Sequence, residues 1–117
     1  MANNPIQRLS DNLREFARAR DWEQFHTPKN LATALVVEAA ELAEHFQWLR
    51  DHESANLSAE KLKQVEMEMG DVFIYLVRLA DTLGVDLVAA AEQKMAINAK
   101  RYPADKARGK ALKHTEL

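Results

Sequence analysis

The chain has 117 residues, 47% of them apolar, and a formal net charge of −2 at pH 7. A chain of this length forms one domain and has enough apolar side chains for a core. The absence of cysteine excludes disulfides, thiolate metal sites and cysteine nucleophiles, and the slightly negative charge argues against a nucleic-acid polymer as partner.

The first half of the sequence predicts two helices, because apolar side chains recur at helical spacing and turn-forming residues are scarce. The first helix is expected over Pro5 to Ala19, with Asn4 as N-cap and proline at its first position. A connector follows from Arg20 to Thr27. The second helix is expected to begin after the cap Thr27 and to end near Leu49. The apolar stripes are Ile6, Leu9, Leu13 and Phe16 in the first helix, and Leu31, Leu35, Ala39, Leu42, Phe46 and Leu49 in the second.

The second half predicts two more helices, which follow a polar loop from Arg50 to Leu57. One is expected to run from the cap Ser58 to Leu83, with Gly84 as its stop. The other begins after the cap Asp86 and ends near Arg101, shortly before a proline. No segment has the alternating pattern of a strand, so we predict an all-α fold.

Two pairs of carboxylates stand three residues apart inside the second and third predicted helices. They are Glu38 with Glu41, and Glu68 with Asp71. Residues at this spacing share one helix face, so two adjacent helices would direct four carboxylates at one point. One pair of like charges ~5 Å apart costs roughly 3 kcal/mol at an effective dielectric of ~20. A hard divalent cation such as Mg²⁺ offsets this repulsion, since it takes oxygen ligands.

Each acidic pair borders an apolar stripe instead of lying in a broad polar face. On a helical wheel, Val37 and Trp48 lie beyond Glu38 and Glu41 on the side away from the stripe. Carboxylates at the edge of a core need a partner, but the pattern alone leaves both a metal site and a solvated surface open. A di-iron bundle needs Glu-x-x-His on two helices. It is disfavoured, because none of the predicted helices carries that motif.

Short motifs lie in order around these acids: RDWEQFH at residues 20–26, EAAELAE at 38–44, FQW at 46–48, DVFIYLV at 71–77, KMAIN at 94–98 and RYP at 101–103. From about Leu9 to Tyr102 the chain resembles the MazG-like nucleotide pyrophosphohydrolases, and its motifs are most similar to the dCTP pyrophosphatase branch. The resemblance implies an antiparallel four-helix bundle that works as a dimer or a dimer of dimers. The corresponding domain is residues 1–102, with residues 103–117 as a polar tail.

The resemblance also implies a reaction. It is the Mg²⁺-dependent hydrolysis of a deoxynucleoside triphosphate, dCTP or a 5-modified dCTP, to monophosphate and pyrophosphate, which cleans the nucleotide pool. Glu38, Glu41, Glu68 and Asp71 match the metal ligands of the family. A water activated by a carboxylate would attack phosphorus in line. Glu41 and Glu44 are both open as its general base, and the number of metal ions is open too.

A nucleotide pocket is implied as well. Aromatic faces allow a base to stack, an asparagine amide can hydrogen-bond a base edge, and a lysine or arginine can contact phosphate. This chain has Leu13 where vertebrate members carry a histidine, and Gly70 where they carry a serine. The residues that match pocket positions are Trp22, His26, Trp48, Tyr75, Lys94 and Asn98, and Lys29 and Arg101 are further candidates for phosphate contact.

Two other functions fit the same sequence. One is an all-α dUTPase-like or other nucleoside triphosphate hydrolase with the same acidic residues, and the other is a non-catalytic helical interaction module. No apolar run reaches the ~18 residues of a membrane helix, and the first residues lack the regions of a signal peptide, so we expect a cytoplasmic protein with no membrane partner. The segment Val72 to Leu83 is apolar almost all round, which predicts an obligate homo-oligomer.

Overall fold

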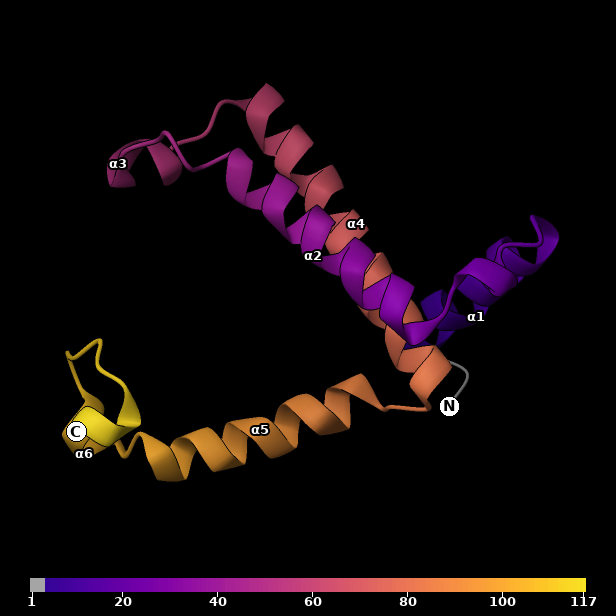
Figure 1. The fold of residues 1–117 in the computed structure, drawn as a ribbon. Helices are drawn as coiled ribbons and strands as arrows, with labels where there is room; N and C mark the ends of the chain where they lie inside the picture. The colour runs from indigo at the N-terminus through magenta and orange to yellow at the C-terminus, as the bar shows by residue number, and fades with distance from the viewer. Residues whose placement is uncertain (1–3) are drawn as a thin grey trace. The chain divides into compact units, whose positions relative to one another are not determined.

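A computed structural model describes residues 4–117, and all regular structure in this range is helical (Figure 1). The predicted all-α class is therefore confirmed. Contacts divide the chain into two units, one that ends at Gly84 and one that runs over Val85–Leu117. The first unit holds α1 (Pro5–Ala19), a 3₁₀ turn (Glu23–Phe25), α2 (Pro28–Glu44), α3 (Asp51–Ser54) and α4 (Ala59–Leu83), and the second holds α5 (Leu87–Arg101), α6 (Ala104–Ala107) and a 3₁₀ turn (His114–Glu116).

The four long helices begin where the sequence predicts, because each has a side-chain cap. A capping oxygen accepts a hydrogen bond from a backbone N–H that the first turn leaves without an intrahelical partner. The predicted bounds of α1, α4 and α5 are confirmed at both ends. The caps are Asn4 (to the N–H of Ile6, 3.0 Å), Thr27 (to Asn30, 3.2 Å), Ser58 (to Lys61, 3.1 Å) and Asp86 (to Ala89, 3.0 Å).

The end of α2 differs from the prediction. The helix stops at Glu44 instead of near Leu49, and the next residues form turns in which most bonds span three residues, such as the Phe46 N–H to the Ala43 carbonyl at 3.0 Å. This tighter pattern ends a helix without glycine or proline. The short α3 then lies in the predicted loop, begun by the Arg50 N–H donating to Glu53 at 2.8 Å. Short helical turns also occur in the predicted tail.

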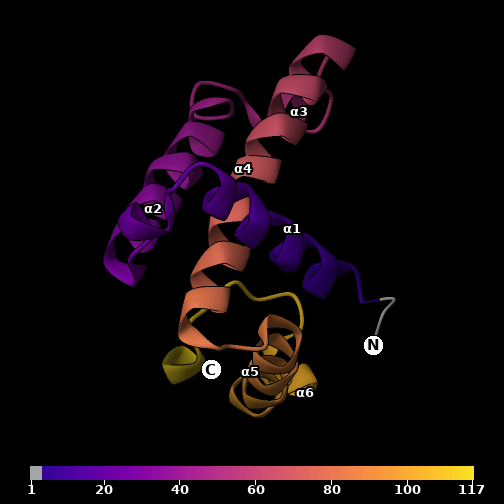
Figure 2. The same ribbon diagram turned by 90° about the vertical axis from the view of Figure 1, so that its right-hand side faces the viewer.

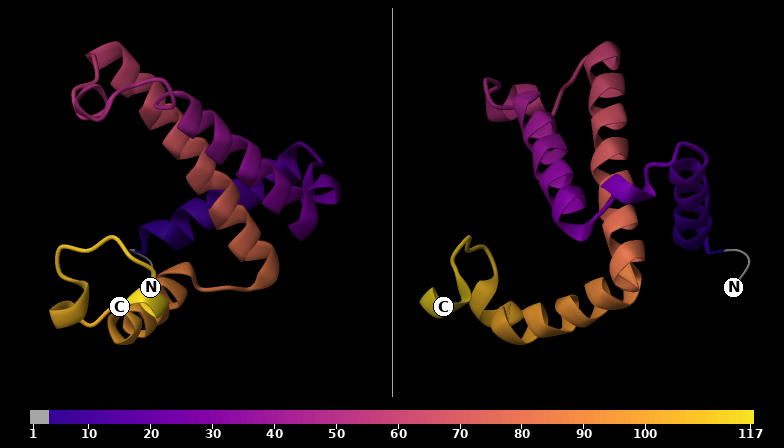
Figure 3. Two further views of the ribbon diagram at one scale, coloured as in Figure 1. Left: turned by 60° about the vertical axis from the view of Figure 1, so that its left-hand side comes forward. Right: turned by 45° about the vertical axis from the view of Figure 1, so that its right-hand side comes forward.

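The central element of the first unit is α4. Helix α2 runs antiparallel beside it (Figures 1 and 3), and α1 crosses it (Figure 2). Leu31 of α2 and Val77 of α4 are the largest fully buried side chains among the described residues. Since α5 belongs to the second unit, the four-helix arrangement stays a prediction, and so does the domain boundary at residue 102.

Helix α1 ends in a left-handed turn at Asp21, where φ is 55°. The Trp22 N–H donates to the Ala17 carbonyl (2.9 Å) and the Asp21 N–H to the Arg18 carbonyl (3.1 Å). This paired pattern ends many helices and usually has glycine at the left-handed position, although aspartate tolerates it. The turn brings Trp22 against Phe16, with ring centroids 5.8 Å apart.

Among the described residues, no helix combines the length and the apolar character that a bilayer crossing requires.

Gly70 inside α4 and Gly84 at its C-cap should respond in opposite ways to substitution by alanine, measured as the free energy of unfolding. Gly84 has φ 67°, so Gly84→Ala forces a side chain into the left-handed region and should destabilise the protein by about 1–2 kcal/mol. A Cβ at Gly70 would meet no atom within 4 Å, so Gly70→Ala should stabilise the helix by about 1 kcal/mol. Urea unfolding measures both. A loss of stability at position 70 would contradict the open space seen there.

Candidate metal centre and adjoining pocket

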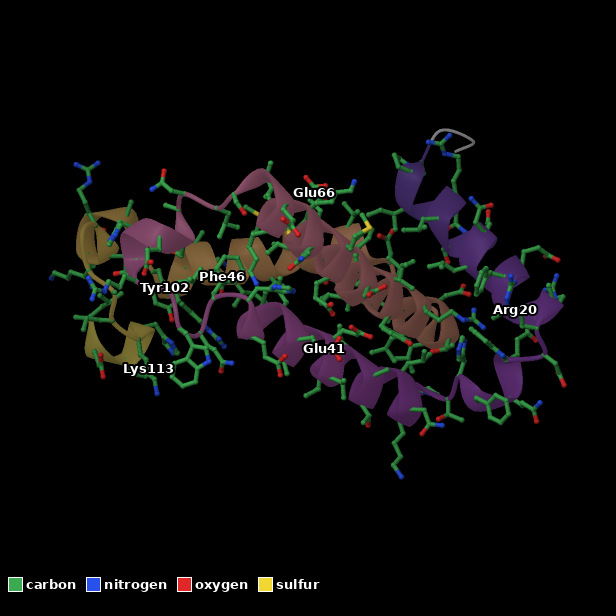
Figure 4. All side chains as sticks on the ribbon, turned by 90° about the horizontal axis from the view of Figure 1, so that it is seen from above. Arg20, Glu41, Phe46, Glu66, Tyr102 and Lys113 are labelled. Atoms are coloured by element: carbon green, nitrogen blue, oxygen red, sulfur yellow. The ribbon has the colours of Figure 1, made fainter. Side chains whose placement is uncertain are left out.

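Three carboxylates meet where α2 and α4 lie side by side. Glu38 and Glu41 of α2 and Glu68 of α4 each offer an oxygen, and these oxygens lie within 4.8 Å of one another. Glu41 lies on the side of α2 that faces α4, whereas Glu66 lies on the opposite side of α4 (Figure 4). The three-residue spacing on α2 and the antiparallel packing together produce the cluster.

The cluster lacks positive charge. Oε2 of Glu38 and Oε1 of Glu68 are buried and have no hydrogen-bond partner, and no ion pair formed by residues 4–117 includes any of the three acids. The neighbouring Glu68 carboxyl group, together with burial, raises the pKa of Glu38, and the neighbouring Glu38 raises the pKa of Glu41. Buried oxygens without partners fit a hard divalent cation, which takes oxygen ligands.

The remaining predicted acids lie outside this cluster. Asp71 is exposed on α4 and lines the adjoining pocket together with Glu38. Glu44 is exposed at the last residue of α2. The structure thus brings together three of the four acids predicted as metal ligands, and the roles of Asp71 and Glu44 stay predictions.

A pocket of about 380 Å³ opens beside the acids within the first unit. Its volume is in the range of small-molecule sites. Mostly apolar and aromatic side chains line it, and Glu38 and Asp71 add two carboxylates. Three residues predicted to bind substrate are among the lining residues. The full lining is Leu13, Phe16, Trp22, His26, Glu38, Asp71, Ile74, Tyr75 and Arg78.

The aromatic wall of the pocket comes from α1 and the connector. The Trp22 ring meets Phe16 edge to face at 5.8 Å and His26 at 6.3 Å. The guanidinium carbon of Arg20 lies 3.6 Å from the centroid of the Phe16 ring, which adds a cation–π contact. These contacts hold the rings of Phe16, Trp22 and His26 together as one aromatic surface of the pocket.

The other residues predicted to bind substrate do not line this pocket. Lys29 is exposed in the first turn of α2, and Trp48, in the turn after α2, is 86% exposed. Lys94, Asn98 and Arg101 are exposed on α5, in the second unit. The roles of all five stay predictions.

A partly buried polar network that includes two pocket residues was missed by the sequence reasoning. Nε of Arg78 donates to Nδ1 of His26 (3.1 Å) and its Nη1 donates to Asp81 (3.0 Å), which also accepts from Nε of Arg14 (3.1 Å). The hydrogen bond from Arg14 lowers the pKa of Asp81, whereas burial, and then the charge of Arg78, lower the pKa of His26. The available signal was an arginine inside an apolar run with an aspartate three residues later.

The sequence matches the model of the MazG-like family over residues 33–117. It is 51% identical to human dCTP pyrophosphatase 1 and 49% identical to the rat protein of the same name, in each case over 105 residues. These matches cover 88% of this chain but 62% of each relative, so the chain spans less than two-thirds of their length. A crystal structure of a pyrophosphatase from Archaeoglobus fulgidus is similar with a TM-score of 0.81 and 40% identity, covering 86% of this chain and 94% of that one.

The acidic cluster predicts that a cation stabilises the fold. With a chelator present, Glu38→Gln should unfold at a higher temperature than the wild type, because one repelling charge is gone. Mg²⁺ at ~100 times its Kd should stabilise the wild type by about 2.7 kcal/mol and the variant by much less. Thermal unfolding with and without Mg²⁺ measures this.

The matched control is Glu66→Gln, which removes an exposed acid of α4 that pairs only with Lys63 at 3.7 Å. It should respond to Mg²⁺ as the wild type does. An equal response of Glu38→Gln and Glu66→Gln would remove Glu38 from the metal site.

Proposed function

Because the chain belongs to the MazG-like family, we propose that it is a nucleotide pyrophosphohydrolase that converts a deoxynucleoside triphosphate, dCTP or a 5-modified dCTP, to monophosphate and pyrophosphate. One observation carries this proposal. A cluster of carboxylates that form no ion pair lies next to a pocket lined by aromatic side chains, and Glu38 belongs to both. The dCTP pyrophosphatases that are about half identical to the chain support the choice of base.

In the proposal, Glu38, Glu41 and Glu68 hold Mg²⁺, with Asp71 as a fourth ligand from the pocket side. Bound Mg²⁺ would supply the positive charge that neutralises a triphosphate beside acidic residues. One buried oxygen of Glu38 and one of Glu68 have no hydrogen-bond partner. They support this role, because both are free to act as ligands of a hard cation.

The pocket residues would bind the nucleoside end of the substrate. Trp22 and Tyr75 offer flat faces for stacking, which is worth about 1–3 kcal/mol per base. Their position beside Glu38 sets the base at one end and the phosphates at the other. The proposal keeps the roles that the sequence predicts for four further residues. These residues contact phosphate or a base edge, and they are Lys29, Lys94, Asn98 and Arg101.

The reaction requires a base that takes a proton from the attacking water. Glu41 and Glu44 are proposed for this role. Glu41 is an exposed member of the acidic cluster, next to the carboxylates that are proposed to hold Mg²⁺. Attack at the α-phosphorus releases pyrophosphate in one step.

We further propose that the protein is a homo-oligomer, a dimer or a dimer of dimers, in which the helices complete a four-helix bundle. Large apolar side chains are exposed along both α2 and α4, and Trp48 is 86% exposed. Large exposed apolar side chains that gather on two helices support an interface there. The exposed residues on these two helices are Val36, Val37, Leu62, Met67, Met69, Phe73 and Leu83.

A cytoplasmic site of action, with neither a membrane nor a nucleic-acid polymer as partner, completes the proposal. It rests on the absence of cysteine, which fits a reducing compartment, and on the net charge of −2.

The products of the reaction test the proposed function. With Mg²⁺, a panel of canonical and 5-modified dNTPs should yield monophosphate and pyrophosphate, with the highest kcat/KM for dCTP or a 5-modified dCTP. Glu41→Gln and Asp71→Asn should lose turnover while they keep the helical circular-dichroism spectrum. First products of diphosphate and orthophosphate would overturn the proposed reaction, a preference for dUTP would favour a dUTPase, and no turnover of any nucleotide would favour an interaction module.

Sedimentation velocity at low micromolar concentration tests the proposed assembly. The wild type should sediment as an oligomer, since obligate interfaces often bury more than ~2,000 Å². Phe73→Glu, on an exposed position of α4, should dissociate it. Phe25→Glu is the matched control, because Phe25 is also exposed but lies in the connector, outside α2 and α4. A stable wild-type monomer would contradict the assembly.

A further inference from the structure

Arg78 is a charged residue that the fold buries, with 7% of its surface exposed. A buried guanidinium is costly unless it is paired and hydrogen-bonded. Arg78 meets both needs, because Nη1 donates to Asp81 at 3.0 Å and Nε donates to Nδ1 of His26 at 3.1 Å. Asp81 is held in turn by Arg14. Arg78 is therefore fixed from one side by an ion pair and from the other by an imidazole.

The direction of the Arg78–His26 hydrogen bond determines the protonation of the ring. A guanidinium has only donors, so Nδ1 of His26 must accept with its lone pair. A neutral imidazole with an accepting Nδ1 carries its hydrogen on Nε2. Protonation of Nδ1 would break the bond and set a second positive charge beside Arg78.

The surroundings of His26 favour the same state. Trp22 packs edge to face against the ring at 6.3 Å, and burial lowers the pKa of His26, with a further decrease from Arg78. The negative groups nearby are Glu23 of the connector, which opposes this decrease, and Glu38 and Asp71, which line the same pocket.

We propose that Arg78 is a positioning residue that holds His26 as a neutral Nε2–H donor, so that this pocket wall recognises an uncharged hydrogen-bond acceptor, the carbonyl oxygen or ring nitrogen of a pyrimidine base. The assignment of a base as the acceptor rests on the proposed function. Trp22 packs against His26 with ring centroids 6.3 Å apart, and the guanidinium of Arg78 already donates to Asp81 and to His26, so a base fits beside this ring better than phosphate. Asp81 and Arg14 support Arg78 from behind.

Nitrogen-15 NMR of the histidines tests the tautomer without any nucleotide or metal. In the wild-type protein near neutral pH, His26 should show a protonated Nε2 and an unprotonated Nδ1. Arg78→Met keeps an apolar side chain of similar length but removes the donor, so the two His26 nitrogens should shift toward tautomer averaging. Arg14→Met is the matched control, since it removes a partner of Asp81 but leaves the donor to His26. A wild-type His26 that is protonated on Nδ1 would overturn the inference.

Steady-state kinetics with dCTP and Mg²⁺ tests the recognition. Arg78→Met should raise KM about fivefold, the equivalent of one net hydrogen bond, and leave kcat within about twofold. An unchanged KM would overturn the positioning role. The expected tautomer in a protein that hydrolyses no nucleotide would contradict the proposed function and leave the Arg78–His26 assignment intact, so the two failures are distinguishable.

Discussion

The packing of α2 against α4 is the constraint on which the rest of the molecule depends. It buries Leu31 and Val77, and the same register brings Glu38, Glu41 and Glu68 together. The apolar contact therefore holds like charges close together although they repel one another. Two of the carboxylate oxygens have no hydrogen-bond partner there. Hydrophobic burial is non-directional, so it can impose a geometry that electrostatics opposes. The proposed cation site is thus a consequence of how the core packs.

The adjoining pocket is also formed in part by α2 and α4. Glu38 belongs both to the carboxylate cluster and to the pocket lining. Around it, α4 contributes Tyr75 and Arg78, and the connector contributes Trp22 and His26. The lining thus combines carboxylates with flat apolar surface, and the proposed nucleotide substrate needs both.

Much of this arrangement follows from local patterns in the sequence. The caps Asn4, Ser58 and Asp86 and the stop Gly84 predict helix bounds because their effect is local. The end of α2 at Glu44 was not predictable in the same way, since a change in hydrogen-bond pattern and not a breaker residue ends it. Spacing along two helices predicted a carboxylate cluster, but which of the four carboxylates lie closest together depends on how α2 packs against α4, which is a tertiary property.

The left-handed turn at Asp21 marks where the connector begins, and substitutions in the connector affect a different part of the site from substitutions in α2 and α4. The connector that follows it carries Trp22 and His26, while the acids lie on α2 and α4. Insertions or substitutions after the turn would reshape the aromatic wall and leave the helix–helix register intact. The part of the pocket that Trp22 and His26 form could therefore change while the acids of α2 and α4 stay in place, because the connector is a separate stretch of backbone.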